Sequence, residues 1–135
     1  MSLPSPVERE HQARILVADD DKDIRDLVAF KLAHAGFEVE AVDDGDSAWS
    51  AIERDPPTLA VLDVMMPRMS GLDVLRLVRH TERTRNVLVV LLTARSRDVD
   101  MHAGLAAGAD DYIIKPVSPR ELLRRIVTVL EGAKT

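Results

Sequence analysis

Residues 15–21 read Ile-Leu-Val-Ala-Asp-Asp-Asp, a short apolar run that ends in three consecutive acids. A run of this length before polar residues is typical of a strand that is buried on both faces. The same arrangement recurs at Asp63, Thr93 and Lys115, each of which follows an apolar run. In a parallel α/β sheet the carboxyl ends of the strands share one edge, and ligands bind there. The sequence therefore predicts that these acids, a hydroxyl and an amine meet at one site.

Helix-like patterns alternate with the apolar runs along the whole chain. Five strands in strict alternation with five helices imply a parallel sheet with right-handed crossovers and helices on both faces. The predicted fold is α/β, a doubly wound, flavodoxin-like (βα)5 sandwich of three layers with strand order 2-1-3-4-5. The strands are expected at 15–18, 37–41, 58–62, 87–92 and 112–114, and the helices at about 22–35, 47–54, 72–78, 97–107 and 119–131.

Local signals place several helix ends. Asp21 is predicted to cap the first helix, where an acid suits the helix dipole, and Gly36 to end that helix in a left-handed conformation. The Asp44–Gly45 pair is expected to form a turn before the second helix. At the last helix, Ser118 is predicted as the N-cap, with Glu121 completing a capping box.

The bulk composition fits one globular domain. The chain has 135 residues, 46% of them apolar and none of them cysteine, which excludes disulfides and thiolate sites. Residues 1–13 contain two prolines and no periodicity. They are predicted to be a flexible leader to a domain over 14–131, with 132–135 as a tail or the start of a linker.

Charge and hydropathy limit the kinds of binding partner that the chain is expected to have. No apolar run approaches the ~18 residues of a membrane span, and the amino end lacks the layout of a secretory signal. A cytoplasmic protein without a membrane partner is therefore expected. The net charge is -5 and no Lys/Arg block stands out, which argues against direct nucleic-acid binding. A scattered, solvated basic face is expected instead, from Arg79, Arg83, Arg85, Arg95 and Arg97.

The predicted strand order gives the acids a chemical role. Strands 1 and 3 are neighbours in that order, so Asp20 and Asp63 face each other with Asp19 beside them. Such hard oxygen ligands suit Mg²⁺, which takes one or two carboxylates plus phosphate oxygens. A carboxylate at position 63 can attack phosphorus and form an acyl phosphate. Thr93 can donate a hydrogen bond to a phosphoryl oxygen, and the Lys115 ammonium can neutralise its charge.

Two neighbouring positions support a phosphoryl site. Ala94 is small enough to leave space for a phosphoryl group beside Thr93. Pro116 makes a cis peptide bond after Lys115 accessible. Both features are expectations from residue type alone.

Four stretches in order carry a resemblance to a known family: Ile15–Asp21, Leu62–Gly71, Leu92–Ala94 and Asp111–Pro116. Together they resemble the signature of receiver domains, the phospho-accepting domains of two-component response regulators. The resemblance covers about residues 14–131. It implies that Asp63 accepts a phosphoryl group from a sensor histidine kinase or a phosphotransfer protein.

The resemblance also implies the other roles at the site. Asp19, Asp20 and Asp63 would hold Mg²⁺ or Mn²⁺, with the backbone carbonyl of Met65 as a further ligand. Lys115 would bind the phosphoryl group. The switch pair would be Thr93 and Tyr112.

The last part of the chain is similar to receivers of the winged-helix transcription-factor class. In that class the fourth helix, fifth strand and fifth helix form a surface that pairs in a homodimer. The resemblance implies the same surface here, with Asp110 or Asp111 facing Arg124 or Arg125 in ion pairs.

Two alternatives remain open at this point. An aspartate-nucleophile phosphatase uses similar chemistry, but it usually carries a second acid two residues after the nucleophile, where this chain has Met65. A flavodoxin-like nucleotide or flavin binder would need a glycine-rich phosphate loop after the first strand. The acids at 19–21 would repel phosphate there in the absence of a metal.

Overall fold

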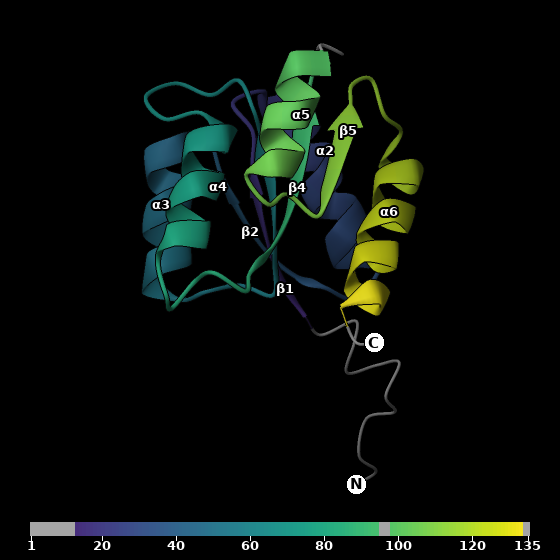
Figure 1. Cartoon of the computed structure of the whole chain (residues 1–135). Helices are drawn as coiled ribbons and strands as arrows, with labels where there is room; N and C mark the ends of the chain where they lie inside the picture. The colour runs from purple at the N-terminus through teal and green to yellow at the C-terminus, as the bar shows by residue number, and fades with distance from the viewer. Residues whose placement is uncertain (1–12, 95–97, 134–135) are drawn as a thin grey trace, which may run out of the picture.

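Five parallel strands form one sheet in the order β2-β1-β3-β4-β5, which confirms the predicted topology (Figure 1). The computed structural model describes residues 13–94 and 98–133, so the predicted leader lies outside the described residues except for Ala13. The strands are β1 (Arg14–Ala18), β2 (Glu38–Val42), β3 (Leu59–Asp63), β4 (Leu88–Thr93) and β5 (Asp111–Ile114). The helices are α2 (Lys22–His34), α3 (Gly45–Arg54), α4 (Gly71–His80), α5 (Asp98–Ala106) and α6 (Pro119–Gly132).

The strands supply two separate cores because successive side chains point to opposite faces of the sheet. Ala60 and Leu62 of β3 pack with α3 and α4, whereas Leu59 and Val61 of the same strand pack with α2 and α6. Figure 1 shows the helices on the two sides of the sheet. All of β3 is buried, as expected for a central strand of a covered parallel sheet. None of the described helices is long and apolar enough to span a bilayer.

The helix ends confirm some of the predicted signals and correct others. Asp21 caps α2 by accepting from two amides of its first turn, and Gly36 follows the helix with φ of 104°. The predicted turn at Asp44–Gly45 is wrong. Asp44 is the N-cap of α3, accepting from the amide of Ser47 at 2.7 Å, and Gly45 is already helical. The Asp44 carboxylate satisfies a free helix amide, so the helix starts two residues earlier.

Only one half of the predicted capping box forms on α6. Ser118 Oγ accepts from the amide of Glu121 at 3.0 Å, but the Glu121 carboxylate binds Arg124. A complete box occurs at the start of α4 instead. There Ser70 and Asp73 each accept from the other's backbone amide.

Arg79 was expected on a solvated face, and the structure corrects this. Its side chain is only 20% exposed. The guanidinium donates to the carbonyls of Gly108, Arg85 and Val87 at 3.0, 3.0 and 2.6 Å, and to Asp110 Oδ2 at 3.0 Å. The fixed fork of five donors lets one side chain join the end of α4 to the segments before β4 and β5. Arg95 and Arg97 of the same expected face lie outside the described residues.

Replacing Arg79 with alanine is expected to lower the free energy of unfolding by about 2–3 kcal/mol, because four hydrogen bonds are lost, two of them to partly buried carbonyls. Arg76 is the matched control on the same helix. It is exposed, and within the described part of the chain its guanidinium makes a single, long ion pair of 3.8 Å with Asp73. Arg76→Ala is expected to change the free energy by no more than about 0.5 kcal/mol. Urea unfolding of both variants measures this, and equal losses would contradict the assignment.

Candidate functional site

Three carboxylates meet where β1 and β3 end. Asp19 and Asp20 directly follow β1, and Asp63 is the last residue of β3. One oxygen from each lies within 4.8 Å of the others. The register of the sheet causes this, since Ala18 pairs with Leu62 and the two strands end side by side. Asp19 and Asp63 are buried at 1% and 4% exposure, whereas Asp20 is exposed.

Lys115 reaches this cluster from the far side of β4. Its Nζ lies 2.9 Å from Asp19 Oδ2 and 3.5 Å from Asp63 Oδ2. Its backbone amide donates to the carbonyl of Thr93 at 2.6 Å, which fixes the start of the side chain above the end of β4. The peptide bond from Lys115 to Pro116 is cis.

The cluster carries more negative than positive charge. Burial, followed by repulsion from Asp19, raises the pKa of Asp63 to about 7, although Lys115 acts in the opposite direction. For Lys115, burial works against the charged form, but the hydrogen bond to Asp19 and the charge of Asp63 outweigh it and raise the pKa. One ammonium among three carboxylates leaves a site that favours an added cation.

This electrostatic strain predicts that Asp63→Asn is more stable than the wild type at about pH 8 without divalent cations. The folded pKa of Asp63 lies above its ordinary value of 3.8. The stability linked to this group is therefore fully present below about pH 4 and is lost as the pH rises through about 7. The neutral amide avoids that loss, so its melting temperature is expected to be higher by roughly 5 °C or more at pH 8.

Thermal unfolding from about pH 4 to pH 8 measures the difference, which should shrink toward low pH. Mg²⁺ should reduce it at pH 8 by stabilising the wild type alone. A variant that is less stable than the wild type at pH 8, or a gap independent of pH, would contradict the charge argument.

Backbone amides hold two of these carboxylates in place. The amide of Asp21 donates to Asp19 Oδ1 at 2.9 Å, and the amide of Met65 donates to Asp63 Oδ1 at 3.3 Å. Arg25, on α2, donates to the Asp19 carbonyl at 2.9 Å. Sequence reasoning missed Arg25, because an arginine one turn into a helix gives no signal of its target.

Two glycines allow the starts of two helices to pack closely against the loop that follows Asp63. A Cβ on Gly71 would lie 2.9 Å from the Asp63 carbonyl carbon and still closer to its oxygen, and a Cβ on Gly45 would overlap the Met69 carbonyl. The first turns of α3 and α4 therefore rest directly on the backbone of this loop. The sequence could have indicated this only through a glycine at each helix start.

The structure also places the remaining predicted residues. Thr93 is buried at the end of β4, and Ala94 beside it is exposed. The Met65 side chain is 70% exposed, with its amide at Asp63. Tyr112 is not among the carboxylates. It belongs to the core on the face of the sheet that α3 and α4 cover, and its hydroxyl has no hydrogen-bond partner among the described residues.

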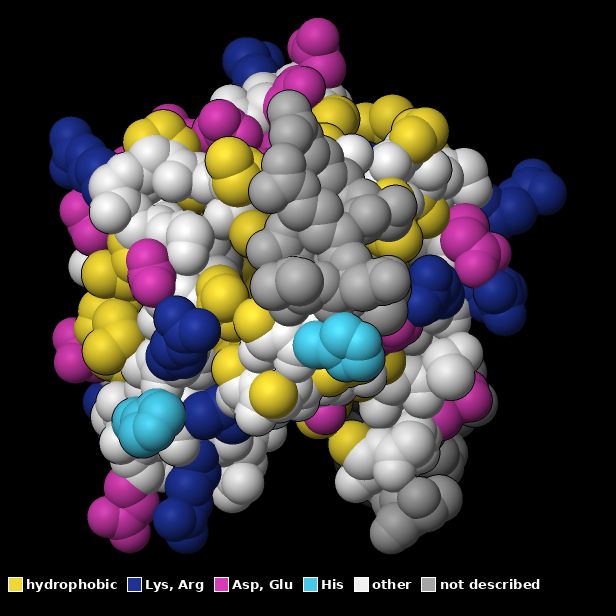
Figure 2. Space-filling view, turned by 45° about the horizontal axis from the view of Figure 1, so that its top comes forward, with side chains coloured by type: hydrophobic (Ala, Val, Ile, Leu, Met, Phe, Trp, Pro, Cys, Tyr) yellow, Lys and Arg dark blue, Asp and Glu magenta, His cyan; other side chains and the backbone are white. Residues whose placement is uncertain are grey.

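The charges expected in a dimer are paired within the chain. Arg125 makes two bonds to Asp111, at 3.0 and 2.6 Å, and Arg124 binds Glu121. Asp110 binds Arg79. Figure 2 shows this side of the molecule, with basic side chains scattered among acidic ones. An ion pair across a dimer interface that used Arg124, Arg125, Asp110 or Asp111 would compete with one of these internal pairs.

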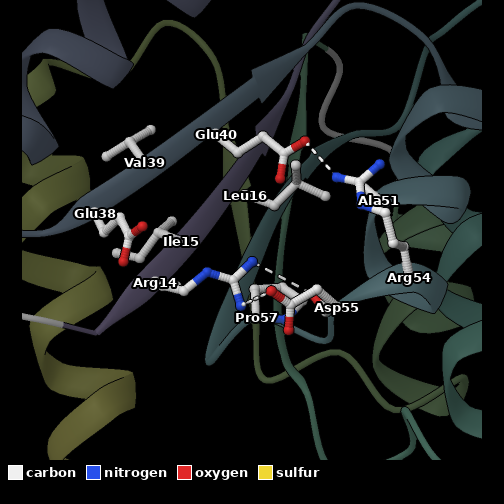
Figure 3. A pocket seen from close by; sticks show the side chains of 10 residues that line it. All are labelled: Arg14, Ile15, Leu16, Glu38, Val39, Glu40, Ala51, Arg54, Asp55 and Pro57. Carbon is white, nitrogen blue, oxygen red and sulfur yellow. Dashed lines mark hydrogen bonds and ion pairs between the residues drawn. The ribbon is translucent and has the colours of Figure 1, made fainter.

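A hollow of about 190 Å³ lies at the opposite edge of the sheet, where β1 and β2 begin (Figure 3). Arg14 pairs with Asp55 at 3.1 Å, and Arg54 pairs with Glu40 at 3.1 Å. Both basic side chains of the hollow are thus paired, which leaves Glu38 as the one further charge among its described lining residues, against the two carboxylates in excess at the acidic cluster. The acidic cluster, with its excess of carboxylates, is therefore the stronger candidate for chemistry.

The fold and this site define a signalling domain of the receiver class. The family profile described as the response regulator receiver domain matches residues 15–127. The chain therefore belongs to the response regulator receiver domain family, whose members act as phospho-accepting domains in two-component signalling.

Among curated relatives, the chain is 44% identical over 117 residues to the phosphate regulon transcriptional regulatory protein PhoB of Klebsiella pneumoniae, covering 87% of this chain and 51% of that protein. It is 42% identical over 113 residues to the DNA-binding response regulator MtrA of Mycobacterium leprae, covering 84% and 49%. The chain thus spans about half the length of these relatives.

Solved structures agree on the fold. A CheY-like response regulator receiver domain protein from Methanospirillum hungatei JF-1 is 32% identical with a TM-score of 0.85, covering 91% of this chain and 97% of that one. The receiver domain of DrrB, solved in a BeF3-activated form, is 37% identical with a TM-score of 0.79, covering 89% and 98%.

Proposed function

We propose that Asp63 is the phosphoacceptor of this receiver and takes its phosphoryl group from the phosphohistidine of a sensor kinase or phosphotransfer protein. The observation that carries the proposal is the position of Lys115, whose ammonium lies within 3.5 Å of both Asp63 and Asp19. A partly buried lysine facing two buried acids where the strands end is suited to neutralise an added phosphoryl group.

The transfer needs a nucleophile and a leaving group. A carboxylate oxygen of Asp63 forms the new P–O bond while the P–N bond to the donor histidine breaks. The imidazole leaves with the bonding electron pair and takes up a proton. The product is an acyl phosphate on Asp63 and a neutral histidine on the donor.

Mg²⁺, or Mn²⁺ in its place, is proposed as the cofactor. The carboxylates of Asp19, Asp20 and Asp63 fit such an ion, because three hard oxygen donors lie within 4.8 Å of one another. The carbonyl of Met65 would add a further oxygen ligand. When bound, the cation would neutralise part of the charge on the phosphoryl oxygens.

Thr93 and Tyr112 are proposed as the switch that reads the phosphoryl group. The Thr93 hydroxyl would donate to a phosphoryl oxygen in the space beside Ala94. Moving Thr93 toward that group changes the room available to Tyr112 on the neighbouring strand. The population of the two states then shifts by as much as the phosphoryl group favours one of them.

An apolar groove beside Lys115 suits the phosphodonor protein. It has a volume of about 420 Å³ and lies between α2 and α6, with Leu27, Val117 and Leu122 among its lining residues. Leu27 and Phe30 of α2 are 54% and 69% exposed. Exposed apolar side chains of this size mark an interaction surface, and a helix docked there would bring a histidine close to Asp63.

The signal is proposed to pass on through a homodimer that forms by the surface of α5, β5 and α6. Arg125 would exchange its internal partner Asp111 for an acid of the second copy. The chain would act in the cytoplasm as a signalling switch and would not turn over a substrate.

Acetyl phosphate with Mg²⁺ tests the proposed chemistry. Intact mass should show one phosphoryl group per chain, and peptide mapping should place it on the peptide that contains Asp63. Hydroxylamine should remove the group, as expected for an acyl phosphate. Absence of uptake, or a label on another peptide, would overturn the proposal. Continuous turnover of a generic phosphate ester would indicate a phosphatase instead.

A further inference from the structure

Gly104 brings the backbone of α5 onto a pair of core side chains. Leu91 of β4 and Tyr112 of β5 are direct neighbours across the two strands, and α5 lies over these strands in Figure 1. A Cβ on Gly104 would lie 2.8 Å from Leu91 Cδ1 and 3.1 Å from Tyr112 Cδ2. Carbon atoms pack at about 3.5–4.0 Å. Any residue other than glycine at this position would therefore have to displace one of the two side chains.

The tyrosine is the side chain that would move. Leu91 is completely buried on β4, which is paired on both sides, by β3 and by β5. Tyr112 stands on the edge strand β5 and retains 7% exposure. Its buried hydroxyl has no partner within the described part of the chain. A buried hydroxyl without a partner costs free energy, so the inward ring is held less firmly than Leu91.

We infer that Gly104 sets the balance between an inward and an outward Tyr112, and thereby the phosphorylation response of this receiver. The inference rests on the proposed function, in which Tyr112 is half of the switch pair. With glycine the inward ring fits beneath α5. A Cβ at position 104 raises the free energy of the inward state. In the proposed switch the phosphoryl group, or beryllofluoride in its place, favours the inward ring. Because this coupling is reciprocal, a substitution that disfavours the inward ring also weakens the binding of beryllofluoride.

Tyr112 is the only tyrosine of the chain, so 3-fluorotyrosine labelling gives one ¹⁹F NMR signal for the switch residue. A soluble nitroxide broadens this signal when the ring is exposed. Gly104→Ala should lower the ratio of inward to outward ring by roughly fivefold or more, given the usual cost of overpacking. The control is Gly132→Ala, also in a helix, where a Cβ would meet no described atom within 4 Å beyond its chain neighbours and its own helix backbone. It should leave the signal unchanged.

The inference would be overturned if the Tyr112 ring of the Gly104→Ala protein were as protected from the nitroxide as that of the Gly132→Ala protein. If Gly104→Ala does not fold, the double variant that combines Leu91→Val with Gly104→Ala is measured instead. That background lacks the Cδ1 atom, so only the ring obstructs the new methyl group, and an inward ring there would also overturn the inference. Beryllofluoride affinity, measured on the same signal, should fall at least fivefold in the alanine variant.

The two proposals fail in different ways. A ring that moves outward in a protein that takes up no phosphoryl label would leave the steric role of Gly104 intact and sink the phosphoacceptor assignment. Normal labelling of Asp63, with the ring unmoved, would sink only the role of Gly104.

Discussion

Asparagine at position 63 is expected to reduce phosphoryl uptake from acetyl phosphate by at least about 100-fold, the scale seen when a nucleophile is removed. The amide has nearly the shape of the carboxylate, but it is uncharged and a poor nucleophile. Asp63 is buried with its carboxylate 3.5 Å from the Lys115 ammonium, whereas its neighbour in the cluster, Asp20, is exposed. The measurement is intact mass after incubation with donor and Mg²⁺.

Asp43→Asn is the matched control, because Asp43 is an exposed acid outside the cluster. It should take up the label like the wild type. Chelation of divalent cations should suppress uptake in the wild type and in the control alike, since the excess negative charge near Asp63 would repel the incoming phosphoryl group. Equal labelling of the two asparagine variants would refute the assignment of the phosphoacceptor.

The fold was predictable because the sheet is covered on both faces. Each central strand is a continuous apolar run, and in β3 every residue is buried, so the strands stand out from the helical periods between them. Once the strand order is 2-1-3-4-5, the ends of β1 and β3 must be neighbours. The meeting of Asp19 and Asp63 follows from that order.

The parts that sequence reasoning missed depend on contacts between distant backbone atoms. Arg79 is drawn inward by carbonyls some 6 to 29 residues away, and nothing in its neighbouring sequence reports those acceptors. Arg25 finds the Asp19 carbonyl in the same way. Gly45 reads as a turn residue in the sequence, whereas in the fold it provides the space for the loop after Asp63 to pass.

A substitution at Gly71, which packs against that loop, should also have a large effect. Gly71→Ala is expected to lower the free energy of unfolding by about 3 kcal/mol, at the upper end of ordinary overpacking. The new methyl group would meet the carbonyl of Asp63 and lie 3.2 Å from the Cα of Val64. Backbone atoms cannot rotate away as a side chain can. The Gly71 amide also donates to the Val64 carbonyl at 3.1 Å, so the contact and the hydrogen bond oppose each other.

The same substitution should slow phosphoryl uptake by roughly tenfold or more, because displacement of reacting groups by about 1 Å carries costs of up to 10²-fold. The Val64 amide donates to the Leu92 carbonyl at 2.7 Å. The loop is therefore tied to β4 on one side and to α4 on the other, and strain introduced at Gly71 passes to the Asp63 carboxylate.

Gly132→Ala separates this effect from the general influence of alanine in a helix. Apart from its chain neighbours and the backbone of its own helix, no described atom lies within 4 Å of the new Cβ. The variant should stabilise the protein slightly, by roughly 0.5 kcal/mol, and label at the wild-type rate. Urea unfolding and a time course of labelling measure both quantities. Gly71→Ala matching this control would mean that the loop after Asp63 yields to the methyl group. Loss of stability with an unchanged labelling rate would mean that strain at Gly71 does not reach the Asp63 carboxylate.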